Sequence, residues 1–241
     1  MAFVFNGKKT SCNYSPSSRV KGSLLQKKIQ LPDNFKNQNP KIDDSIIREL
    51  IKKGNIDFSK SYTPRLLRPL YPFSLRSAEV ACFQSHRKCW QEILDRGLEA
   101  ALIIEDDVDI IDGEFTAAVK LAMKEIKMGD LIRFPMKPRE KPRNRSVKRG
   151  DISIFEPTVI GLGTQAQIVT YDAARRLLEK TEQFDRPIDV YLQLRWKHGV
   201  RVLTLWPNGV RERSSSLGGS LIGKERSNGD KLRRELLRPL Y

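Results

Sequence analysis

The chain has 241 residues, of which 39% are hydrophobic and 30% charged, a size and balance that favour a globular protein over a disordered one. No run approaches the roughly 18 apolar residues of a membrane span, and the N-terminus carries no secretory signal, so we expect a cytoplasmic protein. The net charge of +15 predicts an anionic partner, which could be nucleic acid, an acidic membrane surface or a phosphorylated substrate.

The first half of the chain contains one strongly patterned helix. Residues 1–40 are irregular apart from a short strand expected at 3–5, and a helix is expected at 43–53. A broad apolar stripe then predicts a helix over 77–96, which Gly97 should stop and in which Trp90 should be core. A strand over 100–104 and a helix over 114–128 follow.

The second half alternates strands with helices. Strands are expected at 131–135, 152–160, 167–170 and 201–205, a basic loop at 139–149 and a helix at 171–182. This alternation predicts an α/β fold, with a mixed but mostly parallel sheet and helices on both faces. We expect a single domain over 41–210, preceded by the irregular region 1–40 and followed by a basic polar tail over 211–241.

The cysteines and histidines do not have the spacing of a structural zinc site. Cys82, His86 and Cys89 share one face of the predicted helix, where apolar packing is favoured over a soft-metal site. We therefore expect any metal to be a hard cation bound by oxygen.

Four carboxylates, Glu105, Asp106, Asp107 and Asp109, follow the predicted strand at 100–104. Ligands of open α/β sheets bind at the carboxyl ends of strands, and clustered carboxylates repel one another unless a cation is bound. Mg²⁺ or Mn²⁺ carrying a diphosphate would suit this position. The alternative is a solvated acidic turn, which is the commoner explanation of so short a motif.

Three ordered blocks resemble glycosyltransferase family 25. They are an A-E-V-A-C-F-Q-S-H-R-K-C-W segment at 78–90, the Leu/Ile-rich strand followed by Glu105-Asp-Asp107, and a G-T-Q-A-Q-I-V-T segment that begins at Gly163. Pro-Ile-Asp at 187–189 matches a further element of the family. Departures from the family pattern are Ala78 and Ala81 in place of glycine, and Gln167 in place of tyrosine. The first strand also matches poorly.

The resemblance implies a GT-A-like fold and an inverting, metal-dependent transfer of a hexose, usually galactose. The donor would be a UDP-sugar and the acceptor a bacterial lipopolysaccharide or lipooligosaccharide core at the inner face of the cytoplasmic membrane. Mn²⁺ or Mg²⁺ would be held by Asp107 and Asp109, or by Glu105 and Asp107. The expected general base is Asp189, with Asp106 or Glu105 as alternatives. Donor-binding candidates are Glu79, Ser85, His86, Gly163 and Thr164.

Each candidate also has a structural interpretation. His86 could be a buried, hydrogen-bonded residue, while Glu79 and Asp189 could serve only the N-termini of their helices. Basic residues over 137–149 and 231–239 could contact an anionic membrane or acceptor, or could simply be solvated. Three other functions remain open: nucleic-acid binding, which no recognisable motif accompanies, a metal-dependent phosphotransferase or nuclease, and a catalytically impaired family member.

Overall fold

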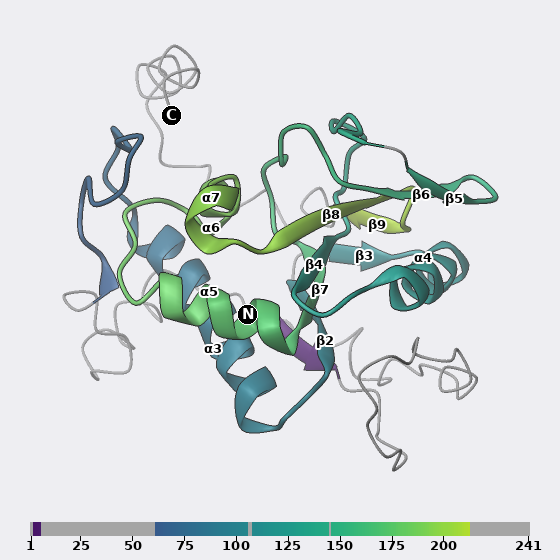
Figure 1. Cartoon of the computed structure of the whole chain (residues 1–241), viewed down its shortest axis with the longest axis horizontal. Helices are drawn as coiled ribbons and strands as arrows, with labels where there is room; N and C mark the ends of the chain where they lie inside the picture. Colours follow the sequence, from purple (N-terminus) through teal and green to yellow (C-terminus); the bar gives the residue numbers. More distant parts are fainter. Residues whose placement is uncertain (1, 6–60, 106–107, 145, 213–241) are drawn as a thin grey trace.

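The structure, a computed structural model, describes residues 2–5, 61–105, 108–144 and 146–212 (Figure 1). The helix expected at 43–53, most of the region 1–40 and the tail beyond 212 lie outside the described residues. The domain boundaries at 40 and 210 therefore stay predictions.

A seven-stranded sheet forms the centre of the fold, in the order β1-β2-β7-β4-β8-β6-β5. Within the described chain, β4 and β8 are its one parallel pair, and every other neighbouring pair is antiparallel. The strands, in sheet order, are β1 (Ala2–Phe5), β2 (Ala100–Glu105), β7 (Ala166–Thr170), β4 (Asp130–Arg133), β8 (Arg201–Trp206), β6 (Ile152–Phe155) and β5 (Val147–Arg149).

The prediction of a mostly parallel sheet is therefore wrong. Continuous apolar runs such as 100–104 show that a strand is buried on both faces, but they do not show its direction. The reversal comes from β7, which lies between β2 and β4 and runs antiparallel to both.

Helices cover both faces of this sheet, as predicted. Helix α3 (Ser77–Asp95) and helix α5 (Tyr171–Lys180) pack together on one face (Figure 1). Helix α4 (Asp112–Glu125) covers the other face. Strand β2 divides its side chains between the two cores, since Ala101 and Ile103 join α3 and α5 whereas Leu102 and Ile104 join α4.

Helix α3 has the ends that the sequence predicts. At its start the Glu79 carboxylate accepts a hydrogen bond of 2.9 Å from the backbone N–H of Arg76. At its end Gly97 adopts a φ of 56°, and the N–H of Leu98 donates to the carbonyl of Ile93. Trp90 is fully buried, which confirms it as a core residue.

A second, two-stranded sheet pairs β3 (Val108–Ile110) with β9 (Val210–Glu212). The sequence analysis did not anticipate this pair. Gly209, with a φ of 72°, precedes β9, and its carbonyl accepts a hydrogen bond of 2.9 Å from the N–H of Ile111. This small sheet fixes the chain shortly after the end of β2.

Two short helices, α6 (Ile188–Leu192) and α7 (Arg195–His198), connect α5 to β8. A search of the described helices finds none with the length and apolar character needed to cross a bilayer.

Candidate functional site

A row of buried polar side chains crosses the α3 face of the sheet. Gln167 of β7 lies opposite Arg133 of β4, which lies opposite Thr204 of β8. These side chains are only 0%, 2% and 1% exposed. Two positions away on the same strands, the same face carries Val169, Leu131 and Val202 of the apolar core. The apolar face therefore changes to a polar one along a single line across the sheet.

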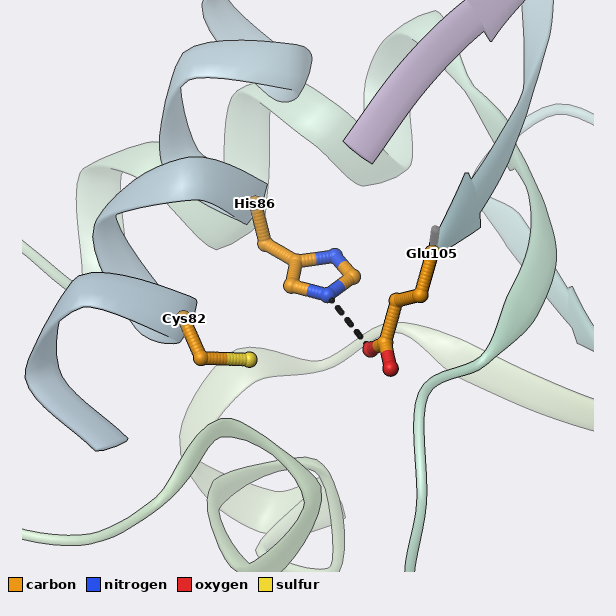
Figure 2. Close-up of side chains that lie close together, drawn as sticks. All are labelled: Cys82, His86 and Glu105. Atoms are coloured by element: carbon orange, nitrogen blue, oxygen red, sulfur yellow. Dashed lines mark hydrogen bonds and ion pairs between the residues drawn. The ribbon is translucent and has the colours of Figure 1, made fainter. Parts of the chain in front are cut away.

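Glu105, the last residue of β2, extends this polar face toward α3. Its Oε1 accepts a hydrogen bond of 2.6 Å from the Thr164 hydroxyl and lies 3.1 Å from His86 Nε2 (Figure 2). The other ring nitrogen of His86 lies 2.9 Å from Gln167 Nε2. These contacts assign the tautomer: Nε2–H donates to the carboxylate, and Nδ1 accepts from the Gln167 amide.

The surroundings of Glu105 keep it ionised. Burial is the largest influence and raises its pKa. The hydrogen bond and the electrostatic attraction of His86, together with the hydrogen bond from Thr164, act against burial, and the pKa of Glu105 lies below its ordinary value.

Asp189 lies in the first helical turn of α6. Its carboxylate contacts the 161–164 turn, which also carries Thr164. Its two oxygens accept hydrogen bonds from the N–H groups of Gly163, at 3.1 Å, and Val190, at 2.8 Å. Burial raises the pKa of Asp189, and the negative charge of Glu105 adds to that effect, against opposing effects of these N–H groups and of Arg133. Two carboxylates whose pKa values move in opposite directions are typical of acid–base sites.

Arg133 holds the 161–164 turn in place. Its Nη2 donates to the Gly163 carbonyl at 2.7 Å, and its Nη1 pairs with Glu140. Glu140 in turn accepts hydrogen bonds from the Gly161 N–H and the Thr204 hydroxyl. Gly163 has a φ of 99°, a conformation that favours glycine. The turn can therefore present the Gly163 N–H to Asp189 and the Thr164 hydroxyl to Glu105.

The structure brings together five of the predicted site residues: His86, Glu105, Gly163, Thr164 and Asp189. His86 is buried, as its structural interpretation requires, but its partner is a site carboxylate.

The other predicted residues do not join this cluster within the described chain. Glu79 binds the backbone at the start of α3, which fits its structural interpretation, and Ser85 is half-buried on the same helix. Asp109 is exposed on β3, in register with Arg211 of β9. Asp106 and Asp107 lie outside the described residues.

Of the acids predicted to hold a hard cation, the described residues include Glu105 and Asp109, and the site itself stays a prediction. Glu105 is ionised and stands at the start of the acidic segment, as a carboxylate ligand of Mn²⁺ or Mg²⁺ would. The metal-binding roles of Asp107 and Asp109 stay predictions.

Four residues of the polar network were missed: Arg133, Glu140, Gln167 and Thr204. A signal for one of them was present, because Arg133 is a lone charge inside the apolar segment Leu-Ile-Arg-Phe at 131–134. A charge in a strand buried on both faces needs a partner, so it marks a specific site.

Comparison with known proteins identifies the family. The family model described as glycosyltransferase family 25 (LPS biosynthesis protein) matches residues 51–192, more than half of the chain. Procollagen galactosyltransferase 1 of Danio rerio is 30% identical over 146 residues, which are 55% of this chain and 22% of that protein. Procollagen galactosyltransferase 2 of Mus musculus is 35% identical over 82 residues, which are 34% of this chain and 12% of that protein.

A third relative, named "Probable inactive glycosyltransferase 25 family member 3" of Bos taurus, is 29% identical over 131 residues, half of this chain and 21% of that protein. The chain thus spans about a fifth or less of the length of these relatives. The family match covers α3, β2, the 161–164 turn and Asp189, and the single α/β domain fits a GT-A-like fold. The resemblance seen in the sequence is confirmed, and the chain belongs to glycosyltransferase family 25.

Proposed function

We propose that this chain transfers galactose from a UDP-sugar, with inversion, to a lipopolysaccharide or lipooligosaccharide core acceptor. The family description names lipopolysaccharide biosynthesis, and two of the relatives are named galactosyltransferases. The observation that carries the proposal is the pair Glu105 and Asp189, two carboxylates attached to one rigid turn with pKa values shifted in opposite directions.

Asp189 acts as the general base in this mechanism. The acceptor hydroxyl attacks the anomeric carbon, its proton passes to the Asp189 carboxylate, and the bond from the sugar to UDP breaks on the opposite face. The raised pKa of Asp189 makes its carboxylate a stronger base than an ordinary aspartate. Each Asp189 oxygen accepts one backbone N–H, so each keeps a lone pair for the incoming proton.

Glu105 serves as a positioning residue. Because it stays ionised, it holds the His86 ring and the Thr164 hydroxyl in fixed orientations beside the reacting groups. Its negative charge also contributes to the raised pKa of the base. Asp106 stays an alternative candidate for the general base.

The proposal includes Mn²⁺ or Mg²⁺, held by Asp107 and Asp109 or by Glu105 and Asp107. Such an ion, when bound, would stabilise the charge on the departing diphosphate.

The acceptor side of the proposal is supported by a pocket of about 170 Å³. Lys137 and Arg139 line it together with Trp206 and with the carboxylates of Asp151 and Glu140, and Glu140 connects its wall to the site turn at Gly161. Two cations beside an indole ring suit a phosphorylated sugar. We propose that the protein works in the cytoplasm with its basic surface against the anionic inner membrane, and we expect no nucleic-acid partner.

A donor screen tests the proposal directly. UDP-, GDP- and CMP-sugars would be compared by thermal shift with and without Mn²⁺, and ligand at a hundredfold excess over its Kd should stabilise the fold by about 2.7 kcal/mol. We expect an increase in melting temperature that needs both UDP-galactose and the metal. Addition of core oligosaccharide should then release UDP. Release of a nucleoside monophosphate would favour a phosphotransferase or nuclease instead. Salt-dependent nucleic-acid binding without donor binding would also contradict the proposal.

Asp189→Asn separates turnover from binding. The amide cannot accept the proton, so kcat should fall by about 10²–10⁴-fold while donor binding stays within a few-fold of the wild type. Donor binding by the wild-type chain without any transfer would identify an impaired member, a state for which the name of the Bos taurus relative sets a precedent.

A further inference from the structure

Three potential metal ligands from two elements meet beside the site. Cys82 and His86 stand one turn apart on α3, and Glu105 reaches them from the end of β2 (Figure 2). The Cys82 sulfur, a His86 ring nitrogen and a Glu105 carboxylate oxygen all lie within 4.8 Å of one another. The proposed transfer reaction gives Cys82 no role.

We propose that Cys82, His86 and Glu105 form a binding site for a soft or borderline divalent cation such as Zn²⁺. Zinc bonds to sulfur, imidazole nitrogen and carboxylate oxygen at about 2.0–2.3 Å, so its tetrahedral ligands lie about 3.3–3.8 Å apart. The Nε2 of His86 and the Oε1 of Glu105, 3.1 Å apart, are already close to that spacing. A shift of about an ångström in the Cys82 side chain is enough to complete the set.

Gln167 provides the supporting hydrogen bond that a metal-bound histidine requires. Zinc binding needs the lone pair of His86 Nε2, which places the ring proton on Nδ1 and calls for an acceptor there. The Gln167 side chain is fully buried, and its Oε1 has no hydrogen-bond partner within the described part of the chain. Turning the amide by half a rotation brings this oxygen to Nδ1, where Nε2 of the amide now lies at 2.9 Å.

The ligand chemistry separates this site from a Mn²⁺ or Mg²⁺ site at Asp107 and Asp109, and the two sites would share Glu105 if the hard cation is held by Glu105 and Asp107. A thiolate with an imidazole selects zinc-like ions, whereas Mg²⁺ and Mn²⁺ prefer oxygen ligands. On binding, Cys82 loses its thiol proton to solvent and bonds to the ion as a thiolate. The sequence prediction against a soft-metal site weighed only residues of one helix, and the third ligand comes from a strand.

Binding at this site has a consequence for catalysis, which rests on the proposed function. An ion at this site takes Glu105 and His86 away from their contacts with each other and with Thr164. Zinc should therefore inhibit transfer by displacing groups that the reaction uses, whereas Mn²⁺ should not.

Cobalt substitution tests the site without any measure of activity. The full chain, reduced and treated with a chelator, would be titrated with Co²⁺ and then with Zn²⁺. We expect one equivalent to produce a thiolate-to-cobalt charge-transfer band that Zn²⁺ abolishes. Cys82→Ser should remove the band. Cys89→Ser and Cys12→Ser should keep it, because Cys89 lies buried in the apolar core and burial raises its thiol pKa to about 11.

Gln167→Met and the inhibition assay complete the test. Loss of the supporting hydrogen bond should weaken Zn²⁺ binding by about 10–100-fold, with circular dichroism confirming that the fold is retained. Zn²⁺ should inhibit the wild type far more than Cys82→Ser. The proposal is overturned by the absence of a band in the wild type, by a band that survives Cys82→Ser, or by equal loss in Cys89→Ser. A band without any transferase activity would leave the metal site standing and reject the proposed function.

Discussion

The molecule contains two clusters of buried charge that differ in what surrounds them. In one, Asp185 and Arg186 pair at 2.7 Å with both side chains fully buried. In the other, Glu105 contacts His86 at 3.1 Å, and its side chain stays 19% exposed. Both are hydrogen-bonded, so burial and pairing alone do not distinguish a structural cluster from a functional one.

The partners of the two clusters differ in kind. The Asp185–Arg186 pair binds backbone groups of one segment: Arg186 donates to the carbonyls of Leu67 and Pro69, and Asp185 accepts from the Leu67 N–H. Glu105 instead meets side chains from a helix and a turn. Backbone partners fix a segment of chain in place, whereas side-chain partners beside solvent can be exchanged for a ligand. This difference indicates that the first cluster is structural and the second functional.

The largest effect on stability should come from breaking the structural pair. Arg186→Leu leaves Asp185 buried without a counter-charge and should lower the free energy of unfolding by about 3–5 kcal/mol, measured by urea denaturation. Donor affinity of the remaining folded protein should be unchanged. The matched control is Arg175→Leu, which removes an exposed pair with Glu179 and should cost at most about 0.5 kcal/mol. Equal effects in the two variants would remove the distinction between the clusters.

A substitution in the site cluster should have the reverse effect, with a small loss of stability and a large loss of activity. Glu105→Gln loses charge-assisted hydrogen bonds from His86 and Thr164 but keeps the shape of the side chain, so unfolding should become easier by only about 1–3 kcal/mol. The rate of sugar transfer should fall by about 10²-fold or more. A variant with full activity and a large loss of stability would place Glu105 with the structural pair.

The smallest effects should appear in the pH dependence of stability. The pKa of Glu105 is lowered by folding, so its contribution is present above its ordinary value of 4.5 and is lost as the pH falls through the folded pKa. The pKa of Asp189 is raised from 3.8, so its contribution is full below that value and is lost as the pH rises through the folded pKa.

On acidification, the free energy of unfolding of Glu105→Gln should therefore fall less than that of the wild type, and that of Asp189→Asn should fall more. Each difference should be roughly 1 kcal/mol for each unit of pKa shift. Chemical denaturation at several acid pH values measures both. Changes of the same sign in the two variants would contradict the opposed pKa shifts.

The local features of the fold could be predicted because they depend on neighbouring residues. The 3.6-residue stripe, the acidic first turn and Gly97 were enough to place α3, and the apolar run at 100–104 was enough to place most of β2. Strand direction was not predictable, since it depends on where β7 inserts. Arg133 and Glu140 pair with each other and both bind the 161–163 turn, which is remote from them in the sequence, so their shared role could not be predicted.

The small β3–β9 sheet has a consequence for when the fold is completed during synthesis. Its register, Val108 opposite Glu212, closes a loop of roughly 100 residues, for which the entropy cost is on the order of 4 kcal/mol. Until residue 212 has left the ribosome, β3 has no complete partner strand. The pairing of β3 with β9 depends on a glycine at position 209, because a Cβ there would come within 2.6 Å of the backbone nitrogen of Phe115. A chain cut before this last described strand would therefore lose both the partner of β3 and Val210, a buried member of the core on the α4 face.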